Sequence, residues 1–306
     1  MRLPRTSALV TLLVLSASLA NPSVSGHPAY AATKPAVRLP GVASDTAAAK
    51  TMTFGVNMAF TMTVGGRTVM GSVIGSGQTD RPNGASSFSL DMSDFVKSIA
   101  AGSGKPLPSL FSDPAQLTMK VISLGNKVWM SYPLLNTILG GAAKTKPWVV
   151  LDAVQLGVDA GDLAASQGAD PTQGLDLLAG LSDTAKDVGT EFIDGAKTRK
   201  YQAAITADTL TKNLPTVQAA DVLKLMGADR SIPVTVWIDE QNRARRFDLT
   251  FRIAQQGRNM TLKATYSFSG FGEPVSITPP PASQVGENAA FLNTLVQAAK
   301  ARKKAA

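Results

Sequence analysis

The chain has 306 residues, with 30 Lys and Arg against 22 Asp and Glu, a net charge of +8, a single histidine and no cysteine. A hydrophobic fraction of 44% is too high for a disordered chain, and the length allows one large domain or two small ones. The lack of cysteine excludes disulfide scaffolds, thiolate zinc sites, iron–sulfur clusters and cysteine nucleophiles.

The first 31 residues have the pattern of a secretory signal peptide. Arg2 and Arg5 precede an apolar run at residues 8–15, and Ala29-Tyr30-Ala31 forms a small-x-small cleavage site. The apolar run is shorter than the about 20 residues that span a bilayer, so no transmembrane helix is expected. We therefore predict an exported protein that resides in the cell envelope or is secreted.

Removal of this segment changes the chemistry of the chain. It takes away two arginines and no acidic residue, which lowers the net charge from +8 to +6, and it includes His27, the only histidine. The remaining chain would have neither imidazole nor thiol groups for catalysis or metal binding. We therefore expect no metal, no cofactor and no enzymatic activity. The carboxylate pairs Asp159 and Asp162, or Glu191 and Asp194, leave glycoside hydrolysis as a remote alternative.

The alternation of side chains at residues 52–64 is the clearest structural signal. Every even position is apolar, and every odd position is small or polar. A period of two over this length predicts a long β-strand with one buried face and one solvated face. Gly65 and Gly66 then predict a hairpin turn into a return strand at residues 68–77.

Further elements follow from the same kinds of pattern. Strands are predicted at residues 86–92, 116–124, 127–132, 148–151, 189–193, 200–207, 234–238, 244–253 and 260–268. Helices are predicted at residues 43–50, 93–101, 133–139, within 153–182, at 219–226 and from 287. Ser93 is the expected N-cap of the helix at 93–101. No rhythm of βαβ units is present, so the predicted class is α+β, with one antiparallel sheet of nine to eleven strands.

A sheet of this size twists and therefore curls. Because its strands have one polar face, helices can cover only the other face, and a curled sheet covered on its concave face can enclose a space.

Three short motifs carry a family resemblance. They are Asp194-Gly195 with Thr198 and Tyr201, then residues 233–239 with 243–247, and finally residues 271–277 with the prolines at 279–281. In this order and spacing they resemble the actinobacterial LppX/LprG lipoprotein family, which is similar in fold to the lipoprotein carriers LolA and LolB. The resemblance covers about residues 45–283.

The resemblance implies a half-barrel sheet closed by helices over its concave face, with a hydrophobic cavity that holds the acyl chains of a lipid or glycolipid, and it implies no catalytic residues. One position departs from the family. Residues 15–18 match the lipid-attachment motif except that Ser18 stands where a cysteine carries the lipid. We therefore expect a released extracytoplasmic form without a lipid anchor.

The expected cavity-facing residues lie on the apolar strand faces. Methionine is flexible and polarizable, which suits a surface that accepts varied chains, although an ordinary packed core also contains Met and Phe. The candidates are Phe54, Met58, Phe60, Met62, Leu90, Met92, Leu249, Met260 and Leu262.

The expected organisation has four parts: a signal peptide at 1–31, a flexible linker at 32–42, the half-barrel domain at 43–283 and a C-terminal amphipathic helix at 284–306. The last turn of this helix carries four basic residues: Lys300, Arg302, Lys303 and Lys304. Basic residues there fit the helix dipole, and they also suit peripheral contact with an anionic membrane. No aromatic-rich basic stripe supports nucleic-acid binding.

Two functions stay open at this point. The first is a non-enzymatic carrier that binds and transports lipids or lipoglycans in the bacterial cell envelope. The alternative is an envelope module with a filled core that binds other proteins and no ligand. A continuous apolar space inside the fold distinguishes the two.

Overall fold

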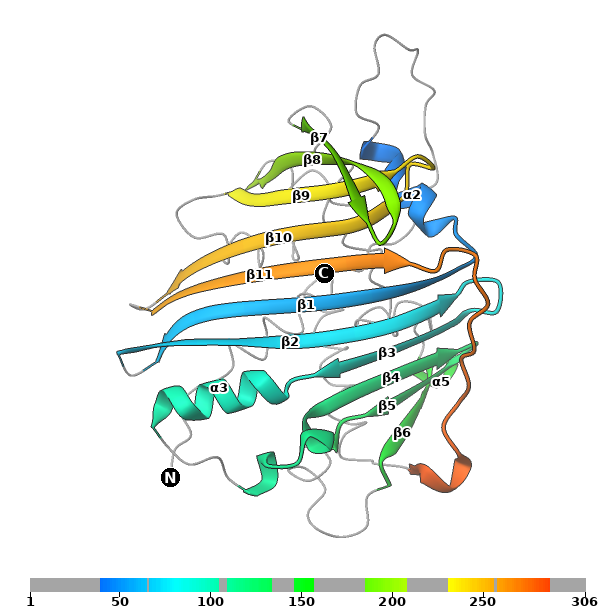
Figure 1. Cartoon of the computed structure of the whole chain (residues 1–306). Coiled ribbons are helices and arrows are strands. Elements are labelled where there is room, and N and C mark those ends of the chain that lie inside the picture. Colours follow the sequence, from blue (N-terminus) through cyan, green and yellow to red (C-terminus); the bar gives the residue numbers. More distant parts are fainter. Residues whose placement is uncertain are drawn as a thin grey trace.

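The computed structural model describes residues 39–64, 66–104, 109–133, 146–156, 185–207, 231–255 and 258–286, and the structural statements below refer to these residues. They contain one sheet of twelve strands, in the order β12-β6-β5-β4-β3-β2-β1-β11-β10-β9-β8-β7 (Figure 1). Neighbouring strands are antiparallel, except that β12 runs parallel to β6. The prediction of a large, curved, antiparallel sheet of class α+β is confirmed.

The predicted strands are found within a few residues of their expected bounds, whereas the helix expected at 43–50 spans residues 39–47. The strands are β1 Thr51–Val64, β2 Arg67–Asp80, β3 Ala85–Asp91, β4 Thr118–Leu124, β5 Lys127–Ser131, β6 Trp148–Asp152, β7 Lys186–Ile193, β8 Ala196–Thr206, β9 Ser231–Asp239, β10 Ala244–Gln255, β11 Arg258–Ser269 and β12 Val285–Gly286. The described α-helices are α2 Leu39–Ala47, α3 Ser93–Ser103 and α5 Ala153–Leu156, and the short 3₁₀ turns are η1 Ser109–Phe111, η2 Pro114–Leu117 and η5 Ala282–Gln284. The twelfth strand, β12, was not predicted, because it lies where the C-terminal helix was expected to begin.

The helices expected at residues 133–139, within 153–182, at 219–226 and from 287 lie wholly or largely outside the described residues. The basic residues Lys300, Arg302, Lys303 and Lys304 lie there too.

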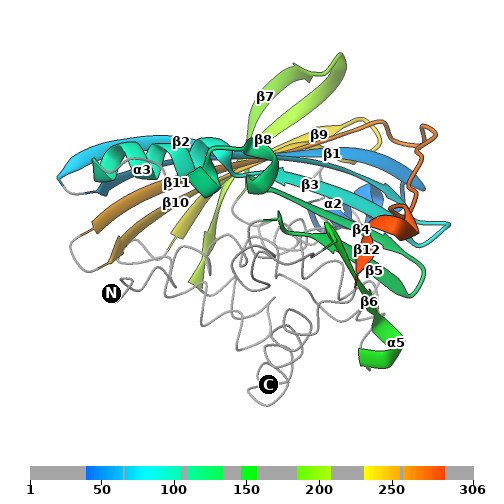
Figure 2. The same ribbon diagram turned by 90° about the horizontal axis from the view of Figure 1, so that it is seen from below.

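The middle of the sheet joins two distant parts of the chain. β1 pairs with β2 on one side and with β11 on the other, and the β1–β11 register runs from Thr53 opposite Ser269 to Met62 opposite Met260. The long central strands β1, β2, β10 and β11 form an arched surface, with β7 rising from its convex side (Figure 2). At a rise of about 3.3 Å per residue, a 14-residue strand such as β1 is about 46 Å long.

The two faces of the sheet differ in polarity as the alternation predicts. On β1 the even residues from Met52 to Met62 are buried, whereas Asn57, Ala59 and Thr61 are exposed. We call the face that carries the even residues of β1 the inner face. It is the concave one, since Leu39 and Val42 of α2 pack into the same core cluster and α2 lies beneath the arch.

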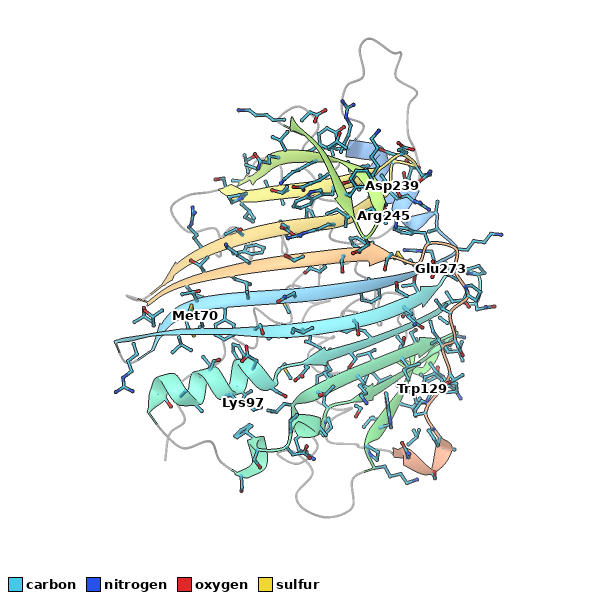
Figure 3. All side chains as sticks on the ribbon, viewed as in Figure 1. Met70, Lys97, Trp129, Asp239, Arg245 and Glu273 are labelled. Carbon is cyan, nitrogen blue, oxygen red and sulfur yellow. The ribbon has the colours of Figure 1, made fainter. Side chains whose placement is uncertain are left out.

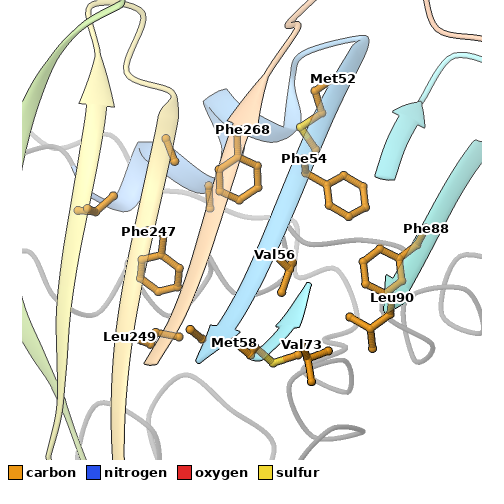
Figure 4. Close-up of a cluster of buried hydrophobic side chains, with 14 of the residues drawn as sticks. Met52, Phe54, Val56, Met58, Val73, Phe88, Leu90, Phe247, Leu249 and Phe268 are labelled. Atoms are coloured by element: carbon orange, nitrogen blue, oxygen red, sulfur yellow. The ribbon is translucent and has the colours of Figure 1, made fainter. Parts of the chain in front are cut away.

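Three glycines of β2 make room for aromatic rings on the inner face. Gly71, Gly75 and Gly77 lie opposite Phe60, Val56 and Phe54 of β1. A Cβ atom on Gly77 would lie 2.2 Å from Cζ of Phe54, and one on Gly75 would lie 2.9 Å from the ring of Phe88. The rings of Phe54 and Phe88 stack at 5.8 Å across this gap, and Figure 4 shows both among the buried side chains of the cluster. Because these positions of β2 carry no side chain, the aromatic rings of the neighbouring strands can extend over β2.

Helix α3 lies beside the part of β2 that β3 does not pair with. The carboxylate of Asp94 accepts hydrogen bonds from the backbone N–H and hydroxyl of Ser72, on the part of β2 that β3 does not reach. Phe95 packs edge-on against Phe60, with ring centroids 4.8 Å apart. Helix α3 therefore covers the end of the inner face formed by Phe60 and its neighbours.

The N-terminal end of α3 differs from the expectation. Ser93 was predicted as the N-cap, but it is already the first helical residue, and its hydroxyl has no hydrogen-bond partner within the described part of the chain. The carboxylate of Asp91 accepts the hydrogen bond from the backbone N–H of Ser93 at 2.8 Å instead. An acidic side chain two residues earlier therefore takes over the capping role.

Residues 39–42 form part of a helix, so the linker predicted for 32–42 ends earlier and α2 begins at Leu39. Leu39 and Val42 are fully buried. The hydroxyl of Thr46 accepts a hydrogen bond from the backbone N–H of Ala244, which fixes α2 at the start of β10. The buried apolar contacts explain why this stretch is ordered despite its Pro and Gly.

Candidate functional site

The nine predicted cavity-facing residues all belong to the apolar core that covers the inner face. Six of them are buried: Phe54, Met58, Phe60, Met62, Leu90 and Leu249. Met92, Met260 and Leu262 are half-buried and pack against the same clusters. Their place on one face is thus established, whereas their contact with a ligand stays a prediction.

Strand pairing aligns these residues in rows across the sheet. Leu262 lies between Phe60 of β1 and Phe251 of β10, and Met260 lies opposite Met62. Two rows beyond Leu262, Tyr266 lies between Val56 and Phe247. Each row brings side chains from both ends of the chain onto a common apolar surface.

Part of this surface stays accessible. Phe251, Met260, Leu262 and Tyr266 are half-buried, although they belong to central strands of the sheet. Their neighbours Met58, Leu249 and Ala264 are buried. We call these four half-buried residues of β10 and β11 the open inner patch. These four side chains keep partly accessible surface on the inner face.

Sequence reasoning left two members of this patch out of the candidate site. Phe251 and Tyr266 were assigned to strands but not to the ligand surface. The alternation along both strands places them on the same face as Leu249 and Leu262, and this signal was sufficient to include them.

Tyr266 differs chemically from the rest of the patch. Its ring packs against Phe247 with centroids 6.1 Å apart, and burial raises the pKa of its phenol to about 12. The hydroxyl is therefore neutral at physiological pH and can act as a hydrogen-bond donor.

The outer face has its own polar cluster around Trp237. The indole N–H donates to the carboxylate of Glu191 on β7, and the cations of Lys200 and Arg246 lie over the indole ring at 4.9 and 4.7 Å. Arg246 also makes two hydrogen bonds to Asp248. These contacts hold the β7–β8 hairpin against the convex side of β9.

The same cluster argues against Glu191 and Asp194 as a hydrolytic pair. Hydrogen bonding from Trp237 is the main cause that keeps the pKa of Glu191 below its usual range, with Lys200 acting in the same direction. A general acid needs a raised pKa. Asp194 occupies a turn with a positive φ of 48° beside Gly195. The other pair, Asp159 and Asp162, lies outside the described residues.

The motifs behind the family resemblance meet at one end of the sheet. The buried carboxylate of Asp239 accepts hydrogen bonds from the backbone N–H groups of Gln241 and Arg243 and from the side chains of Arg243 and Arg245. Both guanidinium groups lie over the ring of Phe271, at 4.4 and 4.7 Å. Figure 3 shows Asp239, Arg245 and Glu273 at this end of the sheet.

The first motif, Asp194-Gly195 with Thr198 and Tyr201, lies at the same end of the sheet as Asp239. Thr198 lies opposite Asp239 in the β8–β9 pair and donates a hydrogen bond from its hydroxyl to the backbone carbonyl of Glu191. The three motifs therefore fix the geometry of the sheet end, and none of them contributes to the open inner patch.

Within the described ranges, no group of three or more His, Cys, Asp or Glu side chains is placed to hold a metal ion. Over the same residues, no helix combines the length and the apolar character that crossing a bilayer requires.

The fold defines the chain as an α+β protein with an open, half-barrel sheet that is apolar inside and polar outside. The family model for the LppX_LprAFG lipoproteins matches residues 118–277, which is more than half of the chain. The chain belongs to this family, and the predicted resemblance is confirmed. The match begins at β4 and ends after β11. The chain contains no cysteine.

Solved structures with a similar fold come from the same family and beyond. LprF from Mycobacterium bovis has a TM-score of 0.41 and 13% identity, and the match covers 80% of this chain and 95% of that one. The lipoprotein LppX from Mycobacterium tuberculosis has a TM-score of 0.39 and 16% identity, with 80% and 100% covered. A LolA superfamily protein from Nitrosomonas europaea has a TM-score of 0.23 and 13% identity, with 80% and 94% covered. No curated protein sequence matches the chain. At these identities and TM-scores the solved structures carry no weight for the function.

Proposed function

We propose that the protein is a non-enzymatic carrier that binds acyl chains of a lipid or glycolipid against the inner face of its sheet and transports them in the bacterial cell envelope. The observation that carries the proposal is the open inner patch, in which Phe251, Met260, Leu262 and Tyr266 keep accessible apolar surface in the middle of a buried face. Export by the signal sequence at residues 1–31 and release without a lipid anchor complete this proposal.

The energetics of transfer support a carrier that needs no chemistry. Each methylene group that leaves water contributes about 0.8 kcal/mol, so a chain of palmitate length gains roughly 12 kcal/mol before the costs of binding. Such a chain does not cross an aqueous compartment at a useful rate alone. A dry, apolar face is sufficient to shield it.

Organic extraction followed by mass spectrometry tests the proposal directly. Purified protein is expected to release a lipid with one or more acyl chains, and protein stripped of lipid is expected to take up a fluorescent fatty acid. Failure of both measurements would leave the alternative, a module with a filled core that binds proteins.

Substitution of Leu262 by glutamate gives a sharper test. It places a carboxylate on the open inner patch, and because an unpaired charge there opposes an apolar ligand, uptake of the fluorescent fatty acid is expected to fall roughly tenfold or more. Thr261→Glu is the matched control, since Thr261 is the next residue of β11 and lies on the opposite face. Circular dichroism verifies that both variants fold. Equal uptake by the two variants would argue against the inner face as the ligand surface.

The basic tail suits a docking role in this carrier. Lys300, Arg302, Lys303 and Lys304 can add about 1 kcal/mol each of attraction near an anionic surface. Sedimentation with vesicles that contain phosphatidylglycerol is expected to show binding that weakens as salt is added. A variant without residues 300–306 is expected to lose most of that binding, and unchanged binding would exclude the tail as the docking element.

A further inference from the structure

Three hydroxyl-bearing side chains form a row across the inner face near one end of the sheet. Thr79 of β2 lies opposite Ser86 of β3, and Ser86 lies opposite Ser123 of β4. On its other side Thr79 lies opposite Met52, which belongs to the inner face and is fully buried. Because directly opposed residues of neighbouring strands point to the same face, all three belong to the inner face. We call Thr79, Ser86 and Ser123 the hydroxyl row.

The surroundings of the hydroxyl row are apolar. The next two inner rows on β1–β4 carry only glycine and apolar residues: Phe54, Gly77, Phe88 and Val121, then Val56, Gly75, Leu90 and Met119. No charged side chain belongs to these two rows or to the hydroxyl row itself. The hydroxyl row is therefore an uncharged polar strip at the end of an apolar surface.

The hydroxyl of Thr79 is buried without a partner. Its oxygen makes no hydrogen bond within the described part of the chain, although Ser86 lies directly opposite. Such burial costs free energy, and valine would fill the same space without this cost. Thr79 and Ser123 are buried, but Ser86 between them is half-buried. A molecule on the inner face can therefore reach the row at Ser86 and offer a partner to Thr79 beside it.

We propose that the hydroxyl row binds an uncharged, hydroxyl-bearing part of the lipid, so that the carrier prefers lipids with free hydroxyl groups to plain esters. A hydroxyl both donates and accepts hydrogen bonds, so a ligand hydroxyl matches the row on both counts, whereas a charged headgroup would be buried here without a counter-ion. This inference rests on the proposed carrier function and deepens it, because it names the chemical class of the polar group. The rows of Met52 and Val56 are four residues apart on β1, about 13 Å, and Tyr266 of the open inner patch lies opposite Val56. One molecule can thus place its hydroxyls at the row and its acyl chain toward the patch.

Competition with an apolar dye tests the preference. N-phenyl-1-naphthylamine is bound to the delipidated full chain and displaced by 1-monopalmitoylglycerol or by methyl palmitate, which carry the same acyl ester and differ in free hydroxyl groups. The affinity for monopalmitoylglycerol relative to methyl palmitate is expected to fall roughly 3- to 10-fold in Thr79→Val, the range of one neutral hydrogen bond. Ser86→Ala is expected to lower the ratio in the same way. The affinity for methyl palmitate is expected to be the same in all these proteins.

Thr61→Val is the matched control, because it makes the same change at an exposed position on the outer face of β1. It is expected to keep the affinity ratio of the wild type. Thermal unfolding followed by circular dichroism gives a second readout. Because Thr79→Val removes a buried hydroxyl that has no partner, the delipidated variant is expected to melt at the same temperature as the wild type or higher.

The outcomes separate this inference from the proposed function. If the wild type binds both competitors and neither Thr79→Val nor Ser86→Ala lowers the affinity ratio, the role of the hydroxyl row is overturned while the carrier function stands. A lower melting temperature of Thr79→Val with an unchanged ratio would show that the hydroxyl serves the protein's own packing, which also overturns the inference. If neither competitor displaces the dye from the wild type and no lipid is extracted, the carrier function itself is overturned, and the inference with it.

Discussion

Replacement of Gly77 by alanine is expected to lower the free energy of unfolding by about 3 kcal/mol or more. The new Cβ would lie 2.2 Å from Cζ of Phe54 and 2.3 Å from the backbone oxygen of Ser87. The ring can move only into its packed neighbours, and the carbonyl belongs to the β2–β3 ladder, where Gly77 lies opposite Phe88. Neither contact can be relieved without loss of packing or of a backbone hydrogen bond. Urea unfolding followed by circular dichroism measures the change.

Gly55→Ala is the control for the loss of a strand glycine. Its Cβ would meet the hydroxyl oxygen of Ser267 at 2.6 Å on the outer face, and that side chain can rotate away into solvent. Alanine also restricts the unfolded chain, which favours folding by about 0.5 kcal/mol. Gly55→Ala is therefore expected to be nearly neutral. Similar losses for the two variants would contradict the idea that the inner glycines exist to admit aromatic rings.

Removal of the Asp239 carboxylate is the second change with a large expected effect. Asp239→Ala leaves the guanidinium groups of Arg243 and Arg245 without their shared partner, and their side chains are only 22% and 16% exposed. The loss of one member of such a buried network is expected to cost about 3 kcal/mol. Asp248→Ala is the control, because the Arg246–Asp248 pair is more exposed and is expected to contribute less than about 1 kcal/mol.

The effect of Asp239 depends on pH in a defined direction. Burial alone would raise the pKa of this carboxyl, but the hydrogen bonds from Arg243 and Arg245 outweigh it and hold the pKa below its usual range. The stabilisation is therefore complete above the ordinary pKa of about 4 and is lost as the pH falls through the lower value of the folded state. Melting temperatures of the wild type and Asp239→Ala are expected to differ most near neutral pH and to converge in acid. A difference that persists unchanged at low pH would show that the carboxylate charge is not the cause.

The strands could be predicted because the alternation of apolar and polar residues along the chain determines them. Alternation along β1 and β11 reports which face is buried, and burial confirms it residue by residue from Met52 to Met62. The pairing of β1 with β11 could not be predicted, because nothing local in either strand specifies a partner so far away in the chain.

Other features depend on packing that a pattern does not encode. Gly71, Gly75 and Gly77 look like weak points in a strand, and only the rings of Phe54 and Phe88 explain them. The order of α2 comes from buried contacts of Leu39 and Val42, which override the local signal of Pro40 and Gly41. In the candidate site, alternation identifies the face but not the part of it that stays accessible, and so Tyr266 and Phe251 were left out of the predicted set.

The central seam between β1 and β11 has a consequence for how the protein reaches its native state. Thr53 and Ser269 share a hydrogen bond across 216 positions of chain. Loop closure over such a distance is slow. Until β11 pairs with it, β1 presents an unpaired hydrogen-bonding edge, and the apolar face of β1 and β2 stays exposed. The nascent half-sheet is therefore the state most exposed to self-association.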